Sequence, residues 1–260
     1  MTDGLNGLTL VLASQRSGST LLCRDIESLG GMGAPGEHFL ELLRAFKEGT
    51  ARPGEAEVLE AIGRGAKAEA PDVGAVKLMV NYAPRIDAFI RGGEEVAQPK
   101  AMQNIIDWAQ ARFERLNLVV LIRANALDQA ISRVVARQTQ VWHRNAGVLG
   151  DADPHGDADL APKKLNAPVL EALPGVIRNT ETLRKVARAN RDIALTLEYE
   201  DLAAAPEDSA RALIAHARRA GFEPRHDAVR RKLSKLIDAE KSQAIRAEFK
   251  AYLQSHLALW

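Results

Sequence analysis

The sequence predicts an α/β fold in which helices cover both faces of a central, mostly parallel sheet. Four short apolar runs are typical of strands that are buried on both faces. Longer stretches with helical spacing separate these runs, and strands that alternate with helices form parallel sheets. The four runs are residues 8–13, 75–80, 118–122 and 193–197.

The first apolar run, residues 8–13, leads into a polar turn with one glycine and then into a helix. The turn is residues 14–20, SQRSGST. Apolar residues then recur at helical spacing, and Gly30-Gly31 predicts the end of that helix. These helical positions are Leu21, Leu22, Ile26 and Leu29.

The remaining sequence predicts more helices, two long connections and a basic tail. Helices are expected over residues 105–116, 127–138, 176–189 and 206–220. The connections 40–70 and 141–174 are longer than usual, and excursions of this length are often lids or binding walls. Glycine, proline and aspartate make the second connection loop-like, and we expect it to be mobile. The tail, residues 228–257, is predicted to be a helix with a solvated basic face.

Length and composition predict a soluble protein with one sizeable domain over residues 1–260, or at most two small ones. The 260 residues are 46% apolar and 27% charged, as in ordinary globular proteins. The net charge of +1 creates no global field for nucleic acid or an anionic membrane. Cys23 is the one cysteine, and the first apolar run is too short for a membrane span. We expect a cytoplasmic protein with no nucleic-acid partner, and a homodimer stays an open alternative.

The turn after the first strand has the features of an anion site. Free N–H groups at a helix N-terminus point at the ligand, and the helix dipole favours negative charge. Gly18 permits a close backbone approach, and Arg16 adds a charged fork. Neither the lysine of a Walker A loop nor a G-x-G-x-x-G pattern is present. On residue types alone, a simple strand-to-helix turn with a serine N-cap stays open.

The complete string of residues 10–22, LVLASQRSGSTLL, resembles the 5′-phosphosulfate loop of the Stf0 sulfotransferase family, S-x-R-S-G-S-T-L-L. Four further segments match that family in the same order, so the resemblance runs from residue 8 to residue 202. It implies a P-loop-like three-layer sandwich and a transferase that uses 3′-phosphoadenosine 5′-phosphosulfate. The matching segments are residues 33–39 (GAPGEHF), 74–80 (GAVKLMV), 123–142 with Arg123, Ser132 and QTQVW, and 198–202 (EYEDL).

The resemblance also implies which residues bind the donor. Arg123 and Ser132 match the pair that binds the 3′-phosphate, although a lone arginine after a strand is also typical of a surface residue. Arg16 is expected to stabilise charge on the leaving group more in the transition state than in the ground state. The residues implied for the 5′-phosphosulfate are Ser14, Gln15, Arg16, Ser17, Gly18, Ser19, Thr20 and Leu21.

Glu37 matches the position of the family's proposed catalytic base. A carboxylate in a partly dry site suits that role, and the alternative is an exposed glutamate near a helix N-terminus. His38 is a competing base and stands where the family has an aromatic residue. Lys77 interrupts an apolar strand, and a site role or snorkelling to solvent are both open.

This chemistry requires no metal, and the sequence has no H-E-x-x-H or clustered Cys/His ligand set. Trp142 is expected to stack on adenine or the acceptor, or to pack in the core. The remaining histidines are expected on the surface. They are His143, His155, His216, His226 and His256.

The acceptor is expected to be a small hydroxyl compound: a sugar, a glycolipid or another alcohol. The family's founding activity is trehalose 2-sulfation, but Ala34 and Val80 replace its glutamate and tryptophan, which puts trehalose in doubt. Two alternatives stay open. A P-loop-like small-molecule kinase would need Mg²⁺, ATP and normally a loop lysine. A catalytically inactive nucleotide-binding protein would have no reason to keep Glu37.

Overall fold

The computed structural model describes residues 4–140, 161–231 and 239–257. Contacts divide the chain into two compact units. The sheet unit comprises residues 1–124 and 179–231, and the helical unit comprises residues 125–178 and 232–260. The assignment of residues 1–260 to one domain stays a prediction.

The sheet unit is built on four parallel strands in the order β2-β1-β3-β4. Parallel pairing places Ala13 opposite Met79, and Leu12 opposite Val120. All four strands that the apolar runs predict are therefore confirmed. Their bounds are β1 (Gly7–Ala13), β2 (Val73–Met79), β3 (Arg115–Ile122) and β4 (Ala194–Glu198).

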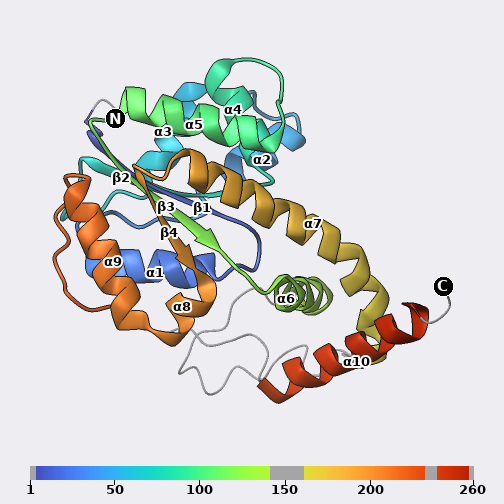
Figure 1. Ribbon diagram of the computed structural model, residues 1–260. Coiled ribbons are helices and arrows are strands. Elements are labelled where there is room, and N and C mark those ends of the chain that lie inside the picture. Colours follow the sequence, from blue (N-terminus) through green and yellow to red (C-terminus); the bar gives the residue numbers. More distant parts are fainter. Residues whose placement is uncertain (1–3, 141–160, 232–238, 258–260) are drawn as a thin grey trace. The chain divides into compact units, whose positions relative to one another are not determined.

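Helices cover both faces of this sheet, as Figure 1 shows. One face is covered by α2 (Leu40–Lys47), α3 (Glu55–Gly63), α4 (Ala83–Arg91) and α5 (Gln98–Arg112). The other face is covered by α1 (Ser19–Leu29), α8 (Tyr199–Ala204) and α9 (Pro206–Arg219). The predicted three-layer α/β sandwich is confirmed, and the predicted long connection 40–70 contains α2 and α3.

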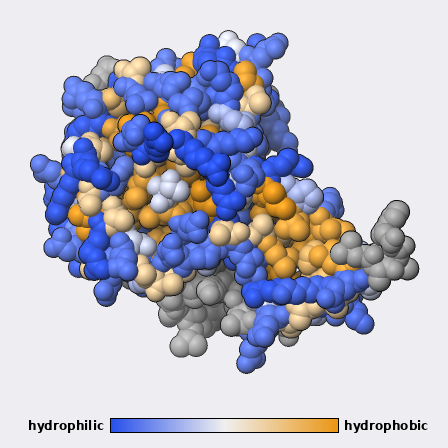
Figure 2. All heavy atoms as spheres, in the orientation of Figure 1, coloured by the Kyte–Doolittle hydropathy of each residue, from blue (hydrophilic) through white to orange (hydrophobic). Residues whose placement is uncertain are grey.

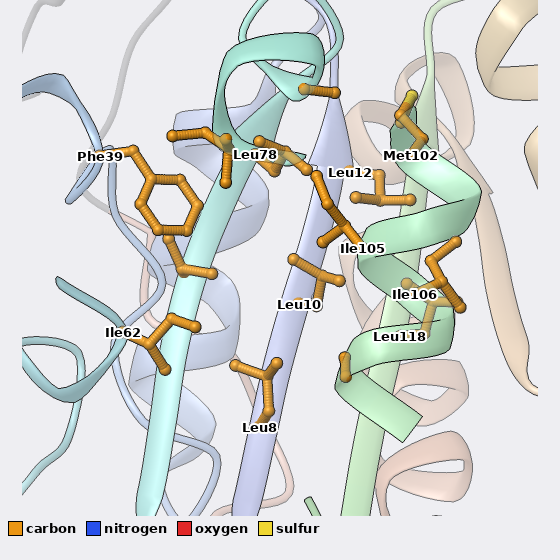
Figure 3. Packing of buried hydrophobic residues seen from close by; sticks show 14 of the residues in the cluster. Leu8, Leu10, Leu12, Phe39, Ile62, Leu78, Met102, Ile105, Ile106 and Leu118 are labelled. Atoms are coloured by element: carbon orange, nitrogen blue, oxygen red, sulfur yellow. The ribbon is translucent and has the colours of Figure 1, made fainter. Parts of the chain in front are cut away.

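Alternation along the central strand builds the two cores. Successive side chains of a strand point to opposite faces. Leu8, Leu10 and Leu12 of β1 therefore pack with α3 and α5 (Figure 3), whereas Val11 and Ala13 pack towards α1. Each of these leucines is at most 1% exposed, and burying one stabilises the fold by roughly 1.5–3 kcal/mol.

The helical unit contains α6 (Ala126–Thr139), the first part of α7 (Pro162–Ala189) and α10 (Ala239–Leu257). Its core includes Ile131, Val169 and Phe249, and Arg246 binds the carboxylate of Asp128 through two 2.9 Å hydrogen bonds. Apolar side chains also lie on its surface over α6 and α7 (Figure 2).

The prediction that residues 162–174 are loop-like is wrong, because they form the first turns of α7 in spite of Pro168 and Pro174. Leu165, Val169 and Val176 recur at helical spacing and are buried in the core of the helical unit. Their burial offsets the hydrogen bonds that the prolines cannot make. Residues 141–160, including Trp142, lie outside the described part of the chain.

The prediction that His216 is a surface residue is also wrong. It is 6% exposed, and its Nε2 lies 3.1 Å from the carbonyl oxygen of Leu118, so α9 is joined to β3 at this point. His226 is exposed as expected, whereas His143, His155 and the side chain of His256 are outside the described residues. In the part of the chain that the structure describes, no helix is long and apolar enough to cross a membrane.

Candidate donor and catalytic site

The candidate site lies where the parallel strands end. Carboxyl ends of parallel strands meet at one edge of a sheet, and ligands of such folds bind in the crevice there. Ser14, Arg123 and Tyr199 directly follow β1, β3 and β4. The fold therefore brings the predicted donor loop, the predicted 3′-phosphate arginine and one tyrosine to the same edge.

The donor loop begins with a tight turn. The backbone N–H and the hydroxyl of Ser17 both donate to the carbonyl oxygen of Ser14, at 3.3 and 2.8 Å. Gly18 follows with φ 88°, in the left-handed region that favours glycine. A Cβ at this position would lie 2.2 Å from Cδ2 of Tyr199. The Tyr199 ring thus packs against the loop, and only glycine fits beneath it.

The first turn of α1 directly follows Gly18. Gly18 is the N-cap residue and has no side chain that could accept from the first-turn amides, and this turn carries no acidic residue. Such amides are donors for an anion. Ser14 to Thr20 therefore lie together in one loop and one helix start, as predicted, and Leu21 lies partly buried beside the core around α1.

Two arginines meet at this loop. Nη1 of Arg123 donates to the carbonyl oxygen of Arg16 at 2.9 Å, and the Arg123 guanidinium lies 4.6 Å from the centre of the Tyr199 ring. Burial lowers the pKa of Arg16, and the nearby charge of Arg123 lowers it further. Two cations that repel each other in a partly buried place favour an anion that neutralises both.

Arg16 also has an unusual backbone conformation. Its φ is 62°, in the left-handed region that residues other than glycine rarely adopt. Such conformations persist when the surrounding structure enforces them, and they cluster at ligand-binding loops. The turn of Ser14 to Ser17 and the hydrogen bond from Arg123 both enforce this one.

Ser132 belongs to the helical unit, where it is half-buried on α6. The helix begins after Asn125, whose side chain accepts from the backbone N–H of Asp128 at 3.0 Å. The joint binding of a 3′-phosphate by Arg123 and Ser132 stays a prediction.

Glu37 lies beside the donor loop because Lys77 of β2 binds both its carboxylate and the preceding residue, Gly36. The backbone N–H of Lys77 donates to the carbonyl oxygen of Gly36 at 2.8 Å. Nζ of Lys77 lies 3.0 Å from Oε1 of Glu37 and 3.5 Å from Oγ1 of Thr20. The Lys77 side chain is 5% exposed and that of Glu37 is 28% exposed. The Lys77 side chain therefore does not snorkel to solvent, whereas the Glu37 carboxylate keeps access to solvent.

His38 is turned back onto its own loop. Its Nε2 lies 3.2 Å from the carbonyl oxygen of Ala34, and the ring packs against Gly36. Because a carbonyl oxygen only accepts, Nε2 carries the hydrogen and only Nδ1 could take up a proton. His38 is thus less available than Glu37 as a base.

The two replacements that put trehalose in doubt, Ala34 and Val80, lie in different surroundings. Val80 is completely buried in the core beside α4, and its relation to an acceptor stays a prediction. Ala34 is partly buried, and its N–H donates to the carbonyl oxygen of Gly65 at 2.7 Å.

Sequence reasoning assigned no role to Tyr199, which contacts both Gly18 and Arg123. The sequence feature that could have indicated this role is an aromatic residue directly after the last strand. Burial raises the pKa of the Cys23 thiol to about 12, so it is not a nucleophile near neutral pH. Among the described residues, no group of His, Cys, Asp and Glu could hold a metal ion.

Comparison with known proteins agrees with this fold. A family model described as Stf0 sulphotransferase matches residues 9–250. The protein is therefore a sulfotransferase. The chain belongs to the Stf0 sulphotransferase family, as its loop motif implied, and the kinase alternative is set aside.

Two solved structures resemble the chain. A sulfotransferase from Alicyclobacillus acidocaldarius has a TM-score of 0.51 at 13% identity, covering 95% of this chain and 92% of its own, and shares the fold. A sulfotransferase domain from the curacin biosynthetic pathway has a TM-score of 0.44 at 14% identity, covering 95% and 98%. A search of curated proteins found no match.

Proposed function

We propose that the protein transfers the sulfuryl group of 3′-phosphoadenosine 5′-phosphosulfate to a hydroxyl of a small acceptor. The observation that carries the donor is the pair Arg16 and Arg123 at a glycine loop that opens a helix. This donor carries anionic groups at both its 5′ and 3′ positions, which matches two cations at one sheet edge better than a singly charged ligand would.

The residues divide the work of binding between them. Arg16 and the first amides of α1 would hold the 5′-phosphosulfate, together with the hydroxyls of Ser17, Ser19 and Thr20. Arg123, with Ser132, would bind the 3′-phosphate. The side chain of Tyr199 supports both parts, because it packs on Gly18 and under the Arg123 guanidinium.

In the transfer itself, the acceptor oxygen forms a bond to sulfur while the bond from sulfur to the leaving phosphate oxygen breaks. The leaving oxygen keeps the electron pair, and Arg16 stabilises its negative charge. The proton of the acceptor hydroxyl passes to the carboxylate of Glu37. Glu37 is favoured over His38, because Lys77 holds it beside Thr20 whereas His38 is bound to Ala34.

The acceptor is proposed to be a sugar, a glycolipid or another alcohol. Ala34 supplies no carboxylate to a sugar hydroxyl, so trehalose is expected to be at best a poor substrate. The proposed chemistry needs no metal ion. A cytoplasmic location and a homodimer stay predictions.

The donor is tested by calorimetry with adenosine 3′,5′-bisphosphate and AMP. Each charge-assisted hydrogen bond to the 3′-phosphate contributes roughly 1.5–3 kcal/mol, so the bisphosphate should bind at least about tenfold more tightly. Arg123→Ala should abolish this preference, and Arg24→Ala is the matched control because Arg24 is exposed at 64% on α1. Equal affinity of the wild type for both nucleotides would contradict the proposal.

The acceptor is found by incubating the protein with radiolabelled donor and the small-molecule fraction of a bacterial extract, and identifying the labelled product. Transfer to a hydroxyl is the expected outcome. Labelling of an amine instead would overturn the acceptor class while leaving the donor intact.

A further inference from the structure

The buried lysine of β2 joins the donor loop to the candidate base. Lys77 Nζ lies between Glu37 Oε1, at 3.0 Å, and Thr20 Oγ1, at 3.5 Å. We infer that Lys77 is a positioning residue for sulfuryl transfer, which holds the carboxylate of Glu37 at the mouth of the donor loop. The inference rests on the proposed function and adds a residue to it.

The burial of Lys77 has no evident structural purpose. Val76 and Leu78 on either side of it are fully buried in an apolar core, and Lys77 itself is 5% exposed. Removing an ammonium group from water costs free energy, and the attraction within a buried ion pair rarely exceeds that desolvation cost. The partners of Nζ in the structure, Glu37 and Thr20, both belong to the candidate site. A costly charge whose partners are site residues indicates a role in the site.

The strand register explains how Lys77 reaches the loop. Lys77 pairs with Val11 of β1, two residues before the end of that strand. Since Val76 and Leu78 face α3, Lys77 points to the opposite face, which α1 covers. Its side chain then extends to Thr20 in the first turn of α1. The neighbouring strand thus supplies a cation to this loop, whose own sequence lacks the lysine of a Walker A motif.

Two links from one residue restrain Glu37. The backbone N–H of Lys77 fixes Gly36, and the ammonium group fixes the carboxylate. Without the ammonium group, a glutamate that is 28% exposed would regain its rotamer freedom and turn to solvent. Displacing a reacting group by about 1 Å can lower turnover about a hundredfold.

The first test is Lys77→Met in the full chain, assayed at saturating radiolabelled donor with the same small-molecule extract. We expect kcat to fall about a hundredfold, while adenosine 3′,5′-bisphosphate binds within about twofold of wild type. The melting temperature should change little, because Glu37, which is 28% exposed, can turn to solvent once its partner is gone. A purely structural lysine would instead lower the melting temperature and spare kcat, and that result would overturn the inference.

The second test separates positioning from direct contact with the donor. Lys77→Met combined with Glu37→Gln should be no more than about twofold slower than Glu37→Gln alone, because both changes remove one interaction. The positioning role would be overturned if the two losses of turnover multiply in the double variant. A large loss of bisphosphate affinity in Lys77→Met would also overturn it. Lys77→Gln should lose turnover like Lys77→Met, and Lys77→Arg should recover part of it.

The control variant is Lys67→Met. Lys67 pairs with Glu27 at 2.8 Å towards the other end of α1, and its loss should leave kcat unchanged. A wild-type protein that does not prefer the bisphosphate over AMP would contradict the proposed donor. A wild type with that preference and a fully active Lys77→Met would contradict this inference alone.

Discussion

At the scale of residues, the site is marked by side chains in surroundings that their types ordinarily avoid. Arg16 has a left-handed backbone and a partly buried guanidinium beside a second arginine. Lys77 is buried in an apolar strand. Each arrangement costs stability in the free protein, and the proposed function gives each a use: binding an anion or holding a carboxylate.

Arg16→Ala should weaken donor binding and turnover with little effect on folding. Alanine keeps the same Cβ and therefore the same backbone strain, whereas the charged fork is lost. We expect bisphosphate affinity to fall at least about tenfold. Calorimetry measures the affinity and circular dichroism checks the fold, with Arg24→Ala as the exposed arginine control. Wild-type turnover in Arg16→Ala would remove this residue from the mechanism.

Cys23 should be unreactive in the folded protein. Burial raises its pKa to about 12, so very little of the thiolate is present at pH 8. A thiol-reactive dye should label the native protein very slowly and the denatured protein rapidly at one site per chain. Labelling of the native protein at the rate of a free cysteine would show that this part of α1 opens readily.

At the scale of elements, the unit of strand β1, donor loop and helix α1 depends on one glycine. Gly18 has a positive φ, and the ring of Tyr199 lies where a Cβ on this residue would be. The sequence motif and the tertiary contact therefore demand glycine for two separate reasons.

Gly18→Ala should damage both stability and donor binding. An alanine with positive φ costs roughly 1–2 kcal/mol, and displacing Tyr199 adds to that cost and moves the Arg123 guanidinium. The matched control is Gly92→Ala, where φ is 65° but nothing lies within 4 Å of the new Cβ. Urea denaturation should show a clearly larger loss for Gly18→Ala, and only that variant should lose bisphosphate affinity. Equal losses in both variants would show that Tyr199 adapts at no cost.

At the scale of the whole molecule, the parallel sheet brings separate segments of the sheet unit to one edge. Its outer layers are held by apolar packing and by a few buried polar contacts, among them the bond from His216 on α9 to Leu118 on β3. The burial of the His216 ring makes the stability of this unit depend on pH.

Burial, together with the charge of Arg219, lowers the pKa of His216 from its ordinary value of 6.5. The folded state thus prefers the neutral ring. The contribution of this ring to the free energy of unfolding is complete above pH 6.5 and is lost as the pH falls from 6.5 through the lowered pKa. The loss approaches about 1.4 kcal/mol per pH unit within that window. Thermal denaturation between pH 7 and pH 5 should show this decline, and His216→Gln should reduce it. His226→Gln, at an exposed position, should not.

The sequence alone determined the strands, the three-layer arrangement, the glycine turn before α1 and the family. These depend on local patterns: continuous apolar runs, a turn with one glycine, and the string from Ser14 to Leu22. The same local reasoning placed residues 162–174 in a loop and His216 on the surface, because it weighed two prolines and one polar residue without their tertiary surroundings. Leu165 and Val169 are buried, and that burial outweighs the prolines.

Only the tertiary structure decided how the site residues meet. Lys77 and Glu37 are forty positions apart in the chain, and Tyr199 lies far beyond Gly18, so no local period relates them. Their contacts depend on the register between β1 and β2 and on β3 and β4 ending at the same sheet edge. Register depends on how all apolar faces pack at once. The motif therefore identifies the loop, whereas the sheet selects the lysine and the tyrosine that complete it.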